Sequence, residues 1–155
     1  MSTVMNPIGT IHTTFTTKDQ APIQGAWHPE NLGTVEVFEQ YAEGLADIEG
    51  FSHLYLIFEL DRCAPAEMTR VPFLSDQPHG LFACRHPARP NPIGLTVVTL
   101  QGREGTALTV GGVDMLDGTP LLDIKPYLPQ FDSFPEASEG WFAGQGDRPK
   151  PAGRE

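Results

Sequence analysis

Cysteine, long apolar runs and positive charge are all scarce in this sequence of 155 residues. The two cysteines, Cys63 and Cys84, are too few for a disulfide framework and too far apart for a zinc knuckle, so we expect free thiols. No apolar stretch approaches the ~18 residues of a membrane-spanning helix, and the chain opens without the pattern of a signal peptide. We therefore expect a cytoplasmic protein with no membrane association and no metal.

The charge is strongly acidic overall but is unevenly distributed. The formal net charge is −10, and an acidic surface opposes non-specific binding to nucleic acid or anionic membranes. Between positions 62 and 103, however, five arginines accompany only two acidic residues. This segment predicts a local site for an anionic or electron-rich ligand; the alternative is a set of surface salt bridges to the acidic first third.

The 16 glycines and 15 prolines favour turns and short strands over long helices. Alternating apolar and β-branched residues predict strands, with 33–41 as an edge or one-face strand and 51–60 as a central strand buried on both faces. One helical turn is expected near 42–48, and the hairpin loop is expected at 101–105. Further strands are expected at 7–15, 79–85, 93–100, 106–116 and 121–129. The pattern predicts an all-β domain, a barrel or a sandwich, with a long loop over 62–79.

The composition changes near position 133, where glycine, proline and charged residues replace the strand pattern. We therefore expect one β domain over 1–134 and a Gly/Pro-rich C-terminal tail over 135–155, extended or disordered. Trp141 and Phe142 within this tail either dock on the domain or a partner subunit, or are placed there by chance.

The segment "RHPARPNPIG" at 85–94 is rigid and carries charge. Each proline fixes its own φ and holds the preceding residue extended, so Arg85, Arg89 and Asn91 are presented from a stiff backbone. Gly94 allows close approach of the backbone to a ligand or to a strand. The segment is typical of a preorganised binding loop, and the alternative is a rigid loop with surface arginines.

A second candidate region spans "GGVDMLDGTPLLDIKPY" at 111–127. Its paired glycines let another group pack against bare backbone. Asp123, Lys125 and Tyr127 alternate along an extended run, so we expect all three on one face, either a polar site or an ordinary exposed strand. His53, alone in an apolar run, is interpreted as a core histidine.

Two long motifs, "FACRHPARPNPIG" and "DGTPLLDIKPYLP", follow "IGTIHT" and "IEGFSHLYLIF" in this sequence. Through these motifs, residues 8–131 resemble the TrmO family, also called TsaA-like. The resemblance implies a small single-domain β-barrel that works as a homodimer and binds S-adenosylmethionine without a Rossmann motif. It also implies tRNA as the substrate, methylated at N6 of the threonylcarbamoyl-modified adenosine at position 37.

The resemblance assigns roles to individual residues. The cofactor-binding residues it implies are Gln24, Asp61, Arg62, Arg85, Leu95, Gly111, Gly112, Val113 and Asp114. Those it implies for acceptor binding or catalysis are Arg89, Asn91, Asp123, Lys125 and Tyr127. Two places depart from the family pattern: Ile23 stands where an arginine is expected, and Asp61-Arg62 replaces the His-Gln pair of the bacterial two-domain members.

We therefore expect an S-adenosylmethionine-dependent methyltransferase in which an acceptor nitrogen attacks the methyl group in line. Alignment matters more than a strong base in such a step, and Asp123 would take or orient the amine proton. Without the C-terminal extension of the bacterial members, tRNA affinity is expected to come from the arginines, a dimer groove or a partner. The alternatives are a small-molecule acceptor and a non-catalytic S-adenosylmethionine-binding module.

Overall fold

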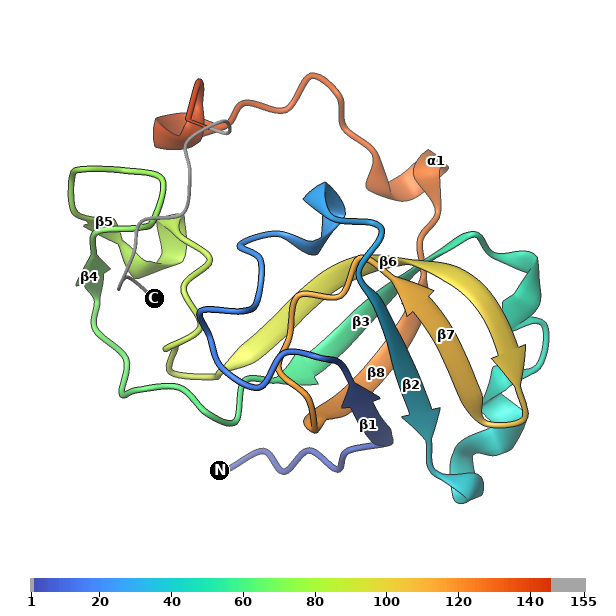
Figure 1. The fold of residues 1–155 in the computed structure, drawn as a ribbon. Coiled ribbons are helices and arrows are strands. Elements are labelled where there is room, and N and C mark those ends of the chain that lie inside the picture. The colour runs from blue at the N-terminus through green and yellow to red at the C-terminus, as the bar shows by residue number, and fades with distance from the viewer. Residues whose placement is uncertain (1, 146–155) are drawn as a thin grey trace. The chain divides into compact units, whose positions relative to one another are not determined.

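The computed structural model describes residues 2–145 of the chain (Figure 1). Two compact units account for these residues. The barrel unit comprises the chain up to Asp61 together with Ile93–Tyr127, and the loop unit comprises Arg62–Pro92 together with the described residues from Leu128 onward.

The barrel unit is a closed antiparallel barrel of six strands, so the predicted all-β barrel class is confirmed. Its strands are β1 (Gly9–His12), β2 (Leu32–Val37), β3 (His53–Glu59), β6 (Ile93–Glu104), β7 (Ala107–Gly111) and β8 (Thr119–Pro126). They pair in the order β1-β2-β7-β6-β3-β8, and β8 pairs with β1 to close the barrel (Figure 1). Alternate residues of β2 are buried, so this strand buries one face as predicted. It pairs with both β1 and β7, and it is therefore not an edge strand.

Alternation along each strand places one set of side chains inside the barrel. In β3, Leu54, Leu56 and Phe58 are buried, whereas Tyr55 and Ile57 between them are only half-buried. The prediction that β3 is buried on both faces is therefore wrong, because the outer wall of a barrel keeps contact with solvent. The buried core includes Ile11, Val35, Val37, Leu54, Leu56, Phe58, Val98, Leu108, Val110 and Leu121.

The hairpin between β6 and β7 is tighter than predicted. Residues 101–104 continue β6 rather than forming the loop, and the register shifts between Leu100 and Gly102. The loop itself is Gly105 and Thr106, since Glu104 pairs with Ala107. Gly105 has a φ of 62°, the positive value that type II′ hairpin turns require at the first loop position.

Two 3₁₀ helices, Glu39–Leu45 and Ile48–Gly50, replace the single helical turn predicted near 42–48. Between them Asp47 adopts a φ of 71°, which interrupts any continuous helix. From β6, Nη1 of Arg103 donates to Leu45 O at 2.9 Å and to Oε1 of Glu49 at 2.7 Å. The arginine thus fastens both helices to the barrel wall. A third 3₁₀ helix, Gly25–Trp27, precedes β2.

The loop unit contains little regular structure. It comprises the paired strands β4 (Thr69–Arg70) and β5 (His79–Gly80), the 3₁₀ helices Leu81–Ala83 and Gly140–Phe142, and the helix α1 (Pro129–Asp132). The strand predicted over 79–85 is wrong beyond Gly80. Leu81 and Cys84 are buried while Phe82 is 78% exposed, a three-residue period that suits a 3₁₀ turn rather than a strand.

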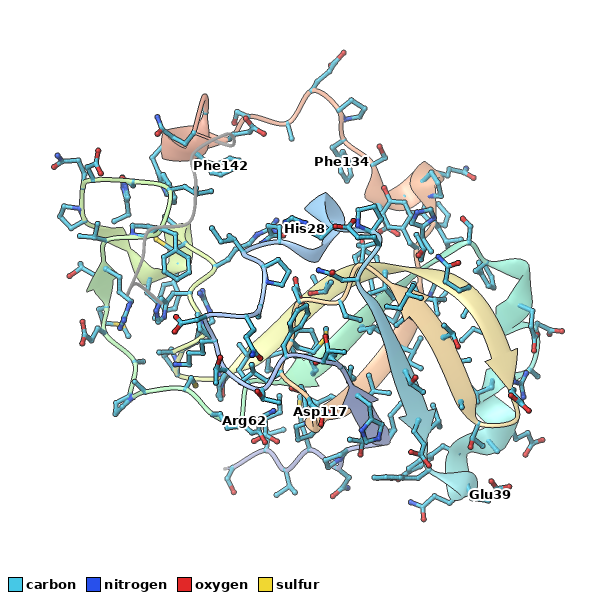
Figure 2. The ribbon with its side chains drawn as sticks, in the orientation of Figure 1. His28, Glu39, Arg62, Asp117, Phe134 and Phe142 are labelled. Atoms are coloured by element: carbon cyan, nitrogen blue, oxygen red, sulfur yellow. The ribbon has the colours of Figure 1, made fainter. Side chains whose placement is uncertain are left out.

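The described part of the predicted tail is held by an aromatic contact within the loop unit, so it is not extended throughout. The Trp141 ring stacks on the His79 imidazole with centroids 4.4 Å apart. Its indole N–H donates to Ala83 O at 2.8 Å. Phe134, which immediately precedes the predicted tail, is exposed (Figure 2). Residues 146–155 of the predicted tail lie outside the described residues.

Candidate functional site

The glycine pair at the end of β7 packs against the segment that carries Gln24. A Cβ atom on Gly25 would lie 1.8 Å from Gly112 O, so the two backbones are in direct contact there. Gly112 has a φ of 86°, and its N–H donates to Asn31 O at 2.8 Å. The expectation that something packs against the bare glycine backbone is confirmed, and that partner is the chain's own loop from Gln24 to Asn31.

Asp114 joins three segments of the barrel unit. Its Oδ2 accepts the Gly25 N–H at 3.1 Å, and its two oxygens lie 2.8 and 3.0 Å from Thr96 Oγ1. Thr96 belongs to β6 and is only 8% exposed. The structure therefore brings the predicted residues around Gln24 and Gly111–Asp114 together through Asp114 itself. Thr96, which the motifs did not single out, holds that carboxylate from β6.

The other cofactor-binding residues predicted in the barrel unit occupy strand surfaces and ends. Leu95 lies in β6 opposite Ile57 of β3, and 61% of its surface is exposed. Asp61 is exposed just beyond the end of β3.

The prediction that Asp123, Lys125 and Tyr127 share a face fits the geometry of β8. Asp123 Oδ2 lies 3.4 Å from Lys125 Nζ, and Asp123 Oδ1 accepts the Ile124 N–H at 2.9 Å. The Tyr127 ring is tilted against the ring of Tyr55, with centroids 5.6 Å apart. The face therefore combines a carboxylate, an ammonium group and aromatic rings.

His53 stands at the exposed start of β3, so its interpretation as a core histidine is wrong. Its Nδ1 lies 2.8 Å from Ser52 Oγ, and its ring centroid lies 6.2 Å from that of Tyr127. The position just before the buried part of the strand keeps this side chain outside the core.

Asp123 also lines a cavity of about 380 Å³ in the barrel unit. The 3₁₀ helices after β2 and the ends of β3 and β8 form its walls, which are mostly apolar. Its volume is at the small end of the range for ligand pockets, ~300–1,000 Å³. The cavity places a carboxylate beside an apolar space.

Gly94 accommodates a side chain of the neighbouring strand. A Cβ atom at this position would lie 2.2 Å from Cε2 of Phe58, which pairs with Gly94 across β3 and β6. Of the two expectations for this glycine, a ligand or a strand, the close approach observed is to the strand.

The arginine-bearing segment of the loop unit is partly braced by its own side chains. Arg89 Nη1 donates to Cys84 O at 2.9 Å and to His86 O at 3.1 Å. These hydrogen bonds join the two ends of the short loop from Cys84 to Arg89. The Arg89 guanidinium also lies 6.0 Å from the centroid of the exposed Phe82 ring. Three other predicted residues of this unit are exposed, namely Arg62 (Figure 2), Arg85 and Asn91.

Cys84 is a poor nucleophile. Burial raises the pKa of its thiol, and the nearby Arg89 charge offsets only part of this effect. Its Sγ lies 3.2 Å from Gly80 O, a distance suited to a thiol that donates. Both cysteines are free, as predicted.

Within residues 2–145, no group of three or more His, Cys, Asp or Glu side chains is placed to hold a metal ion. No helix in this part of the chain is both long enough and apolar enough to cross a membrane.

The family model of the tRNA-methyltransferase O N-terminal domain matches residues 10–133. The chain belongs to this family. The resemblance inferred from the motifs is thereby confirmed, and the match covers all six strands of the barrel except Gly9.

Relatives in this family carry names that refer to S-adenosylmethionine. A probable S-adenosyl-L-methionine-binding protein of Pyrococcus abyssi is 49% identical over 87% of this chain and 73% of its own length. A mouse tRNA (adenine(37)-N6)-methyltransferase is 35% identical over 82% of this chain, which spans 31% of the mouse protein. The crystal structure of TrmO from Pseudomonas aeruginosa superposes with a TM-score of 0.77 and a sequence identity of 36%. The match covers 91% of this chain and 63% of the Pseudomonas chain.

Sequence reasoning missed Thr96, Gly25 and Asn31. Thr96 directly follows Leu95 and carries a hydroxyl at an inward position between apolar residues, which is the only signal the sequence offers for it. Gly25 and Asn31 are ordinary loop residues in sequence, and only the fold brings them to Gly112.

Proposed function

We propose that this chain binds S-adenosylmethionine and transfers its methyl group to N6 of threonylcarbamoyladenosine at tRNA position 37. The observation that carries the proposal is the family match over residues 10–133. The name of the mouse relative, which specifies adenine 37 and its N6 atom, supports the tRNA acceptor.

The residues of the barrel unit have the chemistry that such a cofactor needs. Gly111 and Gly112 are buried beside the loop that carries Gln24, and carboxylates such as Asp61 and Asp114 suit hydroxyl or ammonium groups. In this proposal Gln24 and the backbone of Leu95 complete the contacts. S-adenosylmethionine, when bound, supplies a methyl group on a positively charged sulfonium.

Asp123 is the proposed proton acceptor. The step forms an N6–carbon bond as the sulfur–carbon bond breaks, and the N6 proton passes to the Asp123 carboxylate. Lys125 orients that carboxylate, since its Nζ lies 3.4 Å from Asp123 Oδ2. Tyr127 supports an aromatic surface suited to a nucleobase, beside the Tyr55 ring.

The proposed acceptor carries two kinds of negatively charged group, the phosphates of the tRNA and the carboxylate of the threonylcarbamoyl group. On a chain with a net charge of −10, cationic side chains must meet these groups, and Lys125, Arg62, Arg85 and Arg89 are the proposed candidates. Asn91 is proposed to contribute a neutral hydrogen bond.

The test is methyl incorporation from labelled S-adenosylmethionine into two tRNA pools, one with and one without the threonylcarbamoyl modification. We expect transfer only to the modified pool, detected as the N6-methylated nucleoside after digestion. Asp123→Asn keeps an oxygen for the Ile124 N–H but removes the base, so it should retain cofactor binding and lose transfer. The matched control is Glu104→Gln at the exposed hairpin end, which should behave as wild type.

Other outcomes would redirect the assignment. Transfer to neither pool with the cofactor still bound would support a small-molecule acceptor or a non-catalytic binding module, readings that the net charge favours. We further propose a homodimer, supported by the exposed Ile93 and Leu95 on the outer wall of β6 and testable by sedimentation equilibrium. Cytoplasmic localisation stays a prediction.

A further inference from the structure

Thr96 is a buried hydroxyl at a barrel position where an aliphatic residue would be expected. It faces inward from β6, as does Val98 two residues later, and both are buried. A buried polar group needs a hydrogen-bond partner, and for Thr96 that partner is the carboxylate of Asp114 at 2.8 and 3.0 Å. The Thr96 hydroxyl therefore has a specific partner, the Asp114 carboxylate, and does not merely fill space in the core.

Asp114 in turn holds the beginning of the loop that carries Gln24. Its Oδ2 accepts the N–H of Gly25, the residue after Gln24, at 3.1 Å. The end of the same loop is held separately, because Asn31 O accepts the N–H groups of Gly112 and Val113 at 2.8 and 3.3 Å. The loop is thus tied at both ends to the segment from Gly112 to Asp114, and the first of these two ties passes through a rotatable side chain.

The contact beneath this tie tolerates little movement. The Gly25 and Gly112 backbones touch so closely that a Cβ on Gly25 would lie 1.8 Å from Gly112 O. A carboxylate that turned about its side-chain torsions would release the Gly25 N–H, and the loop would lose its fixed distance from Gly112. The hydrogen bond from Thr96, which belongs to β6, opposes that rotation.

We propose that Thr96 is a positioning residue for S-adenosylmethionine binding: through Asp114 it fixes the Gln24–Gly25 backbone in the arrangement that receives the cofactor. This inference rests on the proposed function. Thr96 acts before the cofactor arrives, since every contact in the chain from Thr96 to Gly25 lies within the protein itself.

The decisive variant is Thr96→Val, which keeps the branched shape and removes only the hydroxyl. We expect the dissociation constant for S-adenosylmethionine, measured by calorimetry on the full chain, to rise roughly tenfold to hundredfold, the range for a lost hydrogen bond to a charged group. In the transfer assay KM for the cofactor should rise while kcat changes little. Thr96→Ser should restore binding, and Thr109→Val, at an exposed position of β7, is the matched control.

Hydrogen exchange of the cofactor-free protein gives a readout independent of binding. Amides of the loop from Gln24 to Asn31 should exchange faster in Thr96→Val than in wild type, with β3 and β8 unchanged. Unchanged cofactor affinity in Thr96→Val would overturn the inference, and so would a Thr96→Ser variant as defective as Thr96→Val. A wild-type protein that binds no S-adenosylmethionine would instead refute the proposed function, and the exchange data would still test the tie between Thr96 and the loop.

Discussion

Replacing Gly94 with alanine tests whether this glycine exists to make room for Phe58. The new Cβ would lie 2.2, 2.5 and 2.8 Å from three ring atoms of Phe58, distances at which something must shift. Phe58 is buried inside the barrel, so the ring cannot swing into solvent. Overpacking of this kind costs about 1–3 kcal/mol, a large part of the roughly 5–15 kcal/mol that stabilises an ordinary domain.

A double-mutant cycle isolates this contact. Phe58→Ala alone should cost about 3–5 kcal/mol, because it removes a buried ring. In that background Gly94→Ala should cost nothing measurable, since its methyl group then enters space the ring has vacated. The double variant should therefore be more stable than the sum of the single changes by about 1–3 kcal/mol.

Urea unfolding followed by circular dichroism measures all four proteins. The matched control is Gly102→Ala in the same strand, where a Cβ meets nothing within 4 Å and the cost should stay within about 0.5 kcal/mol. The steric explanation of Gly94 would be refuted if Gly94→Ala lowered the stability no more than Gly102→Ala does. It would also be refuted if the effects of Gly94→Ala and Phe58→Ala were additive.

Three further predictions concern single groups. The pKa of Glu49 is lowered by a hydrogen bond from its own backbone and then by Arg103, so its stabilising effect is present above the ordinary value of 4.5 and is lost as pH falls through the lowered pKa. Glu49→Gln should accordingly lower the urea midpoint at pH 7, and acidification should abolish the difference; a difference that persists at low pH would contradict this. Cys84, with its raised pKa and burial, should react with a disulfide reagent far more slowly than the half-buried Cys63, and urea should remove the contrast; equal rates in the folded protein would count against it. Gly118→Ala should cost about 1–2 kcal/mol in urea unfolding because φ is 82° there, and Gly118→Asn should cost less; equal costs would argue against backbone strain.

Much of the barrel was predictable because strand alternation is local. The segments around Ile11, Val35, Leu56 and Val98 each carry a strand pattern, and the fold uses all four as inward faces. The same local signal predicted that Asp123 and Lys125 lie on one face of β8. The 3.4 Å distance between Asp123 Oδ2 and Lys125 Nζ is consistent with this prediction. Local patterns failed where tertiary contacts decide backbone conformation, as at Leu81–Ala83, a 3₁₀ turn in place of the predicted strand.

By itself, the sequence determined the family, the all-β class and the positions of most strands, since these depend on residue type and on spacing along the chain. Only the tertiary structure decided which residues meet. It turned Gly94 toward Phe58, folded Arg89 back onto its own loop, and joined Thr96 to Gly25 through Asp114. Gly25 and Asp114 are 89 residues apart, and no local pattern relates them. In a closed barrel each strand pairs with a neighbour on both sides. This pairing fixes where the connecting loops lie, so it brings together loop residues that are far apart in the sequence.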